Sequence, residues 1–361
     1  MSRCKKSIIP GCCVLNFIFF LALVFPACLV AGQGAPADGA GATVLIYHRF
    51  GETKYPSTNV SPERFREQLD YLKNNHYQVI PLTDLVASIK NKTPLPEKAV
   101  VITIDDGFRS IYDKAWPILK SFGYPFTIFP TVNGIDGNTS AYMTWDQARE
   151  LQQAGVDFQD HSYSHYRLTD RPKGLDDAAY RAWIRADLQK GSELLAKKLG
   201  YKPRIFSIPY GEYNSVVLQE IKGLGYEAIM SQDPGVISAD TDPFLMPREP
   251  ILGKEWSTMS HFAEVLNHLD MPISARQPDL APLADGRVKR FGATLLYPDR
   301  YERESLGIYV TGLGWQRAKL EGSTIFIDND KGLSSHINRV TISGKDKKTG
   351  RLAMRCWMVI Q

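Results

Sequence analysis

From residue 43 to about residue 269 the chain alternates between strand-like and helix-like runs, and this alternation restricts the fold more than any other feature. Residues 99–104 form a continuous apolar run, as expected for a parallel strand covered on both faces. A succession of about seven strand–helix units predicts a parallel sheet, and its length indicates a distorted (β/α)7-8 barrel. The expected strands are residues 44–47, 77–80, 99–104, 126–129, 156–160, 205–208 and 226–230. One helix is expected to begin at Ser61, and the others are expected at residues 82–89, 111–122, 144–155, 176–199, 215–224 and 257–269.

Beyond residue 271 the pattern changes to short strand-like runs separated by turn residues, which predicts a small C-terminal β-rich domain. Three prolines and an Asp-Gly pair in residues 272–286 indicate a linker. We therefore expect a main domain at residues 43–271, a linker at residues 272–286 and the β-rich domain at residues 287–361.

Residues 1–42 have the order of an export signal. Basic residues come first, an apolar stretch follows at about residues 8–30, and a tract rich in Gly and Ala ends the segment. Pro26 ends the apolar core, which favours a cleaved signal, while an uncleaved anchor remains the alternative. We expect an exported protein of the periplasm or cell envelope, and an anchor would also associate it with the membrane.

Charge and cysteine content exclude several kinds of partner and site. The formal net charge of +4 is spread along the chain without a long run of Lys and Arg, so we expect no nucleic acid partner. Four of the five cysteines lie in the N-terminal segment, and only Cys356 lies beyond it. A single thiol forms neither an internal disulfide nor a cysteine zinc cluster, so any metal must be held by His and carboxylate side chains.

The strongest motif is Asp105–Asp106 followed by Gly107, directly after the strand expected at residues 99–104. Two adjacent carboxylates at the end of a buried strand are unfavourable unless a positive charge, such as a divalent metal, lies beside them. Asp-Asp-Gly is also a favourable turn sequence, so a plain polar turn is the alternative interpretation.

A second motif places His161 and His165 just after the strand expected at residues 156–160. Histidines four residues apart share one face in helical geometry and can bind one metal ion. A pair of polar loop histidines is the alternative.

Two further motifs also lie at strand ends. In the sequence SIPYG at residues 207–211, Pro209 would stiffen the chain and Gly211 permits an unusual backbone angle. His48 follows Tyr47 at the end of the first strand, where a histidine is well placed for proton transfer. The alternatives are a plain strand-to-helix turn and a histidine with only a structural role.

Together these motifs resemble the polysaccharide deacetylases of carbohydrate esterase family four, which share the nodulation-type deacetylase domain. The resemblance covers roughly residues 43–269. It implies that Asp105 is the general base, that Asp106, His161 and His165 are the metal ligands, and that the backbone N–H of Tyr210 binds the oxyanion.

Two departures from the family pattern resemble one of its subgroups, the deacetylases of poly-N-acetylglucosamine exopolysaccharide. Ser207 stands where the common Arg-x-Pro-Tyr motif has arginine, and the common late Leu-x-His motif is not evident. The subgroup looks circularly permuted, which implies that His48 is the acid and that Arg248 supplies the charge beside the base. A surface position is the alternative for Arg248. The C-terminal region is much too short to be the glycoside hydrolase domain that some of these enzymes carry.

The resemblance implies metal-dependent removal of N-acetyl groups from an exported polysaccharide, with poly-N-acetylglucosamine as the first candidate. Zn²⁺ is the default metal for this ligand set, and Ni²⁺, Co²⁺ or Fe²⁺ also suit it. The alternatives are a deacetylase of peptidoglycan, chitin oligomers or acetylated xylan, and a non-catalytic carbohydrate-binding protein on the same fold. We expect Tyr142, Trp145 and Tyr163 to stack on sugar rings in a groove.

Overall fold

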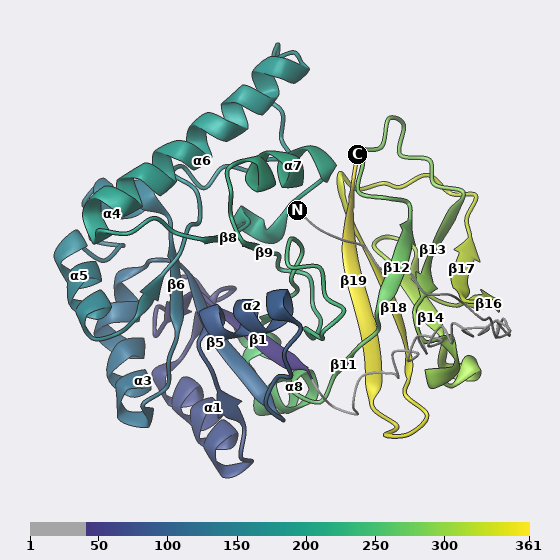
Figure 1. Cartoon of the computed structure of the whole chain (residues 1–361), viewed down its shortest axis with the longest axis horizontal. Coiled ribbons are helices and arrows are strands. Elements are labelled where there is room, and N and C mark those ends of the chain that lie inside the picture. Colours follow the sequence, from purple (N-terminus) through teal and green to yellow (C-terminus); the bar gives the residue numbers. More distant parts are fainter. Residues whose placement is uncertain (1–40) are drawn as a thin grey trace, which may run out of the picture. The chain divides into compact units, whose positions relative to one another are not determined.

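The computed structural model describes residues 41–361 (Figure 1). The export segment expected at residues 1–42 therefore lies outside the described residues, apart from its last two. Among residues 41–361, none of the helices has the length and apolar character that crossing a bilayer requires.

Eight short parallel strands form the centre of the first part of the described chain. They are β1 (Ala42–Tyr47), β4 (Gln78–Val79), β5 (Ala99–Asp106), β6 (Thr127–Pro130), β7 (Asp157–Phe158), β8 (Ile205–Ser207), β9 (Ala228–Met230) and β10 (Glu249–Pro250). One sheet has the order β10-β1-β5-β6-β7 with β4 beside β5, and β8 pairs with β9. A single parallel bridge from Asp160 to Phe206 links the two sheets, and another joins Met230 of β9 to Met246, three residues before β10, which pairs with β1. This circuit is the strand arrangement of a barrel.

Helices follow most of these strands and pack around the sheet (Figure 1). Thr144 opens the helix predicted at residues 144–155 through a capping box, because its side chain and that of Gln147 each accept the other's backbone N–H. The helix predicted at residues 111–122 begins instead with a π-helical turn, since Pro117 lacks the N–H that an unbroken α-helix needs there. The helices are α1 (Pro62–Asn74), α2 (Leu82–Asn91), the π-helix η1 (Ile111–Ala115), α3 (Trp116–Phe122), α4 (Val132–Asp136), α5 (Trp145–Gln153), α6 (Asp177–Leu199), η2 (Pro209–Gly211), α7 (Ser215–Gly223), η3 (Lys254–Ser257) and α8 (Met259–Val265), and a short pair of strands is β2 (Arg49–Phe50) and β3 (Asn59–Val60).

The C-terminal part contains two mainly antiparallel sheets. Its elements are β11 (Leu269–Asp270), β12 (Ile273–Gln277), β13 (Arg290–Leu295), η4 (Pro298–Arg300), η5 (Arg303–Ser305), β14 (Gly307–Val310), β15 (Gly314–Arg317), β16 (Lys319–Glu321), β17 (Thr324–Asp328), β18 (Ile337–Lys345) and β19 (Leu352–Ile360). The sheet orders are β11-β19-β18-β14-β15 and β12-β13-β17-β16. Phe291, Ile325 and Trp357 belong to a separate apolar core between them. The stretch expected as a linker includes β12, which pairs with β13.

Strand β19 joins this β-rich part to the first part of the chain. Its inner side faces the core of the two sheets, whereas Met358 and Ile360 pack into an apolar cluster with Ile208 and Tyr213. The Met358 N–H also donates a hydrogen bond to the Tyr213 hydroxyl at 3.1 Å. One face of the five-stranded sheet is therefore partly covered by the loops that follow β8 and β9.

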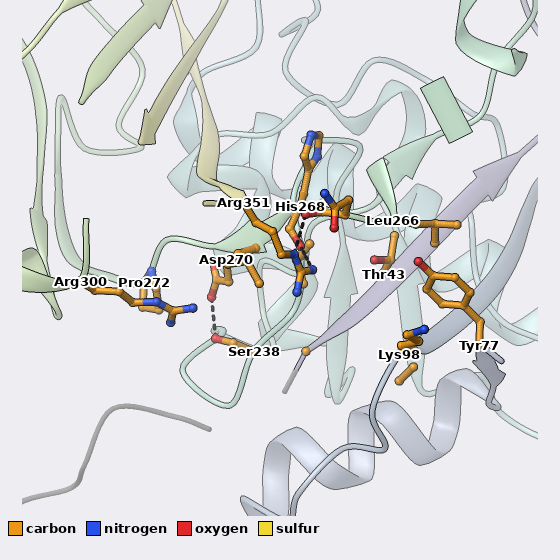
Figure 2. A pocket seen from close by; sticks show the side chains of 15 residues that line it. Thr43, Tyr77, Lys98, Ser238, Leu266, His268, Asp270, Pro272, Arg300 and Arg351 are labelled. Carbon is orange, nitrogen blue, oxygen red and sulfur yellow. Dashed lines mark hydrogen bonds between the residues drawn. The ribbon is translucent and has the colours of Figure 1, made fainter. Parts of the chain in front are cut away.

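A cavity of about 130 Å³ lies at the amino-terminal ends of β1 and β5. Figure 2 shows Thr43 and Lys98 on one side of it and Arg300 on the other, with Arg351 between them. Arg351 donates to the backbone carbonyls of Asn267 and His268, both at 2.9 Å. The reactive motifs of the sequence lie instead at the opposite, carboxyl-terminal ends of these strands.

Candidate metal and active site

Two neighbouring strand ends bring an Asp–His–His cluster together. Asp106 ends β5, and His161 and His165 lie in the loop after β7. The Asp106 Oδ1 atom lies 3.2 Å from His165 Nε2 and 3.6 Å from His161 Nε2. One ligand atom from each of the three residues lies within 4.8 Å of the others. The residues predicted as metal ligands thus converge on one point.

The donor atoms of this cluster fit a divalent cation. His161 Nδ1 lies 2.8 Å from the Ser207 carbonyl, a bond that puts the ring proton on Nδ1 and leaves the Nε2 lone pair free. His161 Nε2 and Asp106 Oδ1 are buried without a hydrogen-bond partner, an unfavourable state that a cation would relieve. Ligand atoms of a tetrahedral zinc site lie about 3.3–3.4 Å apart at ordinary bond lengths, close to the two separations observed here.

The backbone at these strand ends is held in an unusual conformation. Four residues at the site have positive φ angles, a backbone conformation that is strained for residues other than glycine. They are Asp106 at 73°, Ser162 at 68°, His165 at 56° and Tyr210 at 59°. The Ser162 hydroxyl accepts the backbone N–H of His165 at 2.9 Å, which closes a tight turn between the two histidines. The turn directs both imidazole rings toward Asp106, and their centroids lie 4.8 Å apart.

Asp105, the other carboxylate of the pair, faces a different partner. Its two oxygens accept hydrogen bonds from Arg248, each at 2.8 Å, and both side chains are fully buried. Burial acts to raise the pKa of Asp105, but the charge of Arg248 outweighs it and holds the pKa below its ordinary value. Asp105 is therefore kept ionised, and its Oδ2 lies 3.8 Å from His161 Nε2.

Burial acts to raise the pKa of Asp106 as well. The imidazoles of His161 and His165, close to Asp106 Oδ1, outweigh this effect and hold the pKa of Asp106 well below its ordinary value. The two adjacent carboxylates thus stay charged for different reasons, one through a guanidinium and the other through two imidazoles.

His48 and Tyr210 complete the cluster. His48 follows β1 and is buried, and burial lowers its pKa against the opposing charges of Asp106 and Asp105. Its Nδ1 atom is buried without a hydrogen-bond partner. Tyr210 lies in η2, with its ring centroid 4.5 Å from that of His165. Six of the seven residues predicted for the site therefore lie at or just after the carboxyl ends of strands, and Arg248, which precedes β10, reaches Asp105 through its side chain.

The site also contains contacts that the sequence did not reveal. The Ser207 hydroxyl accepts a hydrogen bond from Arg248 at 2.7 Å and donates one to Asp105 at 3.2 Å. Thr103 Oγ1 and the Ser231 carbonyl accept the remaining Arg248 contacts at 3.2 and 2.8 Å. The one available signal was Ser207 itself, at the position where the family motif has arginine, because a short side chain there makes room for a guanidinium from elsewhere.

Of the three aromatic residues expected in a sugar groove, Tyr142 lies beside the site. Its ring packs against Phe108 with centroids 5.1 Å apart, and the charge of Asp106 contributes to its pKa, which burial raises. Trp145 and Tyr163 instead contact α6, where their rings lie under Lys198 and Lys190. These contacts favour a structural role for the latter pair.

The fold is that of known deacetylases. A Streptococcus pyogenes deacetylase, PplD, superimposes with a TM-score of 0.56 at 23% identity and covers 63% of this chain and 98% of its own. IcaB from Ammonifex degensii gives a TM-score of 0.53 at 26% identity and covers 63% of this chain and 96% of its own. The predicted class, a distorted (β/α)7-8 barrel, is thereby confirmed.

Sequence comparison adds the family. Residues 92–229 match the family model for polysaccharide deacetylase, so this part of the chain is similar to that family. The poly-beta-1,6-N-acetyl-D-glucosamine N-deacetylase of Escherichia coli strain K12 is 30% identical over 214 residues, which cover 50% of this chain and 32% of that protein. The Staphylococcus epidermidis protein of the same name is 26% identical over 216 residues, covering 58% of this chain and 73% of its own length. The chain thus spans about a third of the length of the Escherichia coli relative.

Proposed function

We propose that the chain is a metal-dependent hydrolase that removes N-acetyl groups from an exported polysaccharide. The observation that carries this proposal is the convergence of two differently supported carboxylates with two histidines. Asp106, His161 and His165 form a donor set for a cation, while Asp105 stays ionised beside it through Arg248.

Each side chain has a distinct task in this reaction. Asp106, His161 and His165 would hold a divalent cation, which would supply Lewis acidity to the acetyl carbonyl and the attacking water. Asp105 accepts the proton of that water, because its carboxylate stays ionised and lies beside the Asp106, His161 and His165 cluster. The backbone N–H of Tyr210 donates to the oxyanion. His48 gives a proton to the departing amine, which leaves poorly without one.

The polymer, the metal and the location follow as parts of the proposal. Poly-N-acetylglucosamine is the first candidate substrate, since relatives from two genera carry that polymer in their names. Zn²⁺ is the first candidate metal because two imidazoles and a carboxylate are ordinary zinc ligands. Such a substrate places the protein in the periplasm or cell envelope, and residues 1–42 would direct its export or anchor it.

The test is acetate release from a panel of polymers by chelated and then metal-restored protein. The panel contains poly-N-acetylglucosamine, peptidoglycan, chitin oligomers and acetylated xylan. We expect release from the first polymer only after metal is restored, and none from Asp105→Asn protein that still binds metal. Full activity of Asp105→Asn would remove Asp105 as the base, and absence of release from every polymer would favour a non-catalytic carbohydrate-binding protein.

A further inference from the structure

The free edge of the five-stranded sheet β11-β19-β18-β14-β15 carries two exposed aromatic side chains. Trp315 on β15 is 57% exposed and Tyr309 on β14 is 44% exposed. Among the large hydrophobic side chains of residues 41–361, Trp315 has the greatest exposed fraction. Two adjacent exposed aromatic rings form a candidate binding surface, which the groups around them must support.

The two rings are built into the sheet. Tyr309 and Trp315 are direct partners in the antiparallel register of β14 and β15. A Cβ atom added at Gly307 would lie 2.3 Å from the indole atoms Nε1, Cε2 and Cζ2 alike. The indole therefore lies flat across Gly307, with one face on the glycine backbone and the other toward solvent. Any side chain at this glycine would lift the ring.

Hydrogen-bonding groups surround the rings on the same face. In the strand register Thr341 of β18 is opposite Tyr309, and Ser343 is opposite Gly307. Arg317 of β15 is opposite Gly307 on the other side and is exposed. Because side chains directly opposite in neighbouring strands point to one face, hydroxyls and the Arg317 guanidinium, which is paired with Glu304, flank the two aromatic rings.

This face continues to the loops of the candidate active site. Thr341 is opposite Cys356 on β19, whose sulfur lies 4.0 Å from Asp233. Asp233 accepts a hydrogen bond from Tyr213, just after η2, and the adjacent Gln232 packs against Gly211. With strands about 4.8 Å apart, Tyr309 and Trp315 lie about 10 and 14 Å along the sheet from β19.

We propose that Tyr309 and Trp315 form a second carbohydrate-binding site, which holds pyranose units of the polysaccharide outside the catalytic site. The identity of the polymer rests on the proposed function. A flat aromatic face packs against the C–H face of a pyranose ring, and nearby hydroxyl and guanidinium groups bond to the sugar hydroxyls and acetamido groups. The polar flanks favour a sugar over a second protein chain, whose apolar interface core would exclude them.

The experiment measures binding of the full chain, kept in chelator, to soluble poly-N-acetylglucosamine by tryptophan fluorescence and co-sedimentation. Trp315→Ala is expected to raise the Kd for the polymer about tenfold, and Tyr309→Ala several-fold. Trp315→Phe should recover part of the loss, because it restores a flat ring. Leu296→Ala is the matched control, an exposed apolar side chain in the β-rich part but outside this face, and should leave the Kd unchanged.

Two further measurements separate the possible failures. In metal-restored protein, Trp315→Ala should lower kcat/KM for the polymer but leave kcat/KM for a short soluble oligomer unchanged. The binding site is refuted if Trp315→Ala and Tyr309→Ala bind the polymer as the parent does, or if the parent binds none of the four polymers. Conversion of a dimer to a monomer by Trp315→Ala, with polymer binding unchanged, would also overturn it. Acetate release by the parent protein reports separately on the proposed function.

Discussion

Arg248 donates to both oxygens of Asp105 at 2.8 Å, although 143 positions separate the two residues in the chain. Both side chains are fully buried, and the Ser207 hydroxyl contacts both of them. Two parallel bonds between a planar guanidinium and a carboxylate fix direction as well as charge. Arg248 therefore sets both the orientation and the ionisation of the proposed base.

Replacing Arg248 by Met should destabilise the fold and abolish most activity. Removing one partner of a buried ion pair costs about 3–5 kcal/mol, because Asp105 would remain charged without a partner or take up a proton. Urea denaturation measures the loss of stability, and acetate release measures the loss of activity. The double variant Asp105→Asn/Arg248→Met should recover part of the stability, and a single variant as stable as the parent would contradict this account.

Replacing His165 by Gln should weaken metal binding without unfolding the protein. His165 is partly exposed and supplies one of the three donor atoms, so its loss should lower zinc affinity by at least about 100-fold. Titration of the metal-free protein with Zn²⁺ measures the affinity directly. His268→Gln is the control, since His268 is paired with Glu249 elsewhere, and equal affinities for the two variants would contradict the proposed ligand set.

Replacing His48 by Gln should separate proton transfer from metal binding. A general acid contributes about 10²–10⁴-fold to the rate, and His48 is not among the three residues whose donor atoms converge. We expect acetate release to fall by that factor while zinc affinity stays within about threefold of the parent. A parallel loss of zinc affinity would make His48 a ligand or its support, not the acid.

Replacing Asp157 by Asn should change how stability depends on pH. Burial raises the pKa of Asp157 above its ordinary value of 3.8, so the folded chain holds this proton more tightly than the unfolded chain. The resulting stabilisation is complete below that ordinary value and is lost as pH rises through the raised pKa. The asparagine of the variant has no proton to lose in this range. The free energy of unfolding of the variant should therefore rise relative to that of the parent as pH increases.

The measurement is urea denaturation of both proteins at several values from about pH 3 to about pH 7. Only the difference between the two proteins matters, because every other carboxylate titrates in both. A difference that stays constant or falls with pH would contradict the direction of this shift.

The parts of the site that lie within single strand–loop units were predictable from sequence. The apolar run ending at Asp105 and Asp106 gives both the strand and its polar end within eight residues. The same holds for His161 and His165 after β7. Local pattern suffices here because barrel topology places every strand's carboxyl end on one side.

The contacts across the barrel were not predictable in this way. Arg248 reaches Asp105 because β10 pairs with β1, joining Leu45 to Glu249, and no local signal specifies that pairing. The role of Ser207 depends on the same closure. The sequence predicts a linker where the structure has β12, because prolines at 272 and 278 flank this segment and its side chains are mostly polar. The segment forms a strand only through its pairing with β13.

The four left-handed residues of the site limit how the protein can be made more heat-resistant. Each stores strain, so glycine at Asp106, Ser162, His165 or Tyr210 would relax the backbone and remove a functional side chain or its support. Lys92, at φ 52° after α2, carries the same kind of strain far from the chemistry. Stabilising substitutions should therefore be made first at such distant turns, where glycine would raise the free energy of unfolding by about 1 kcal/mol without loss of turnover.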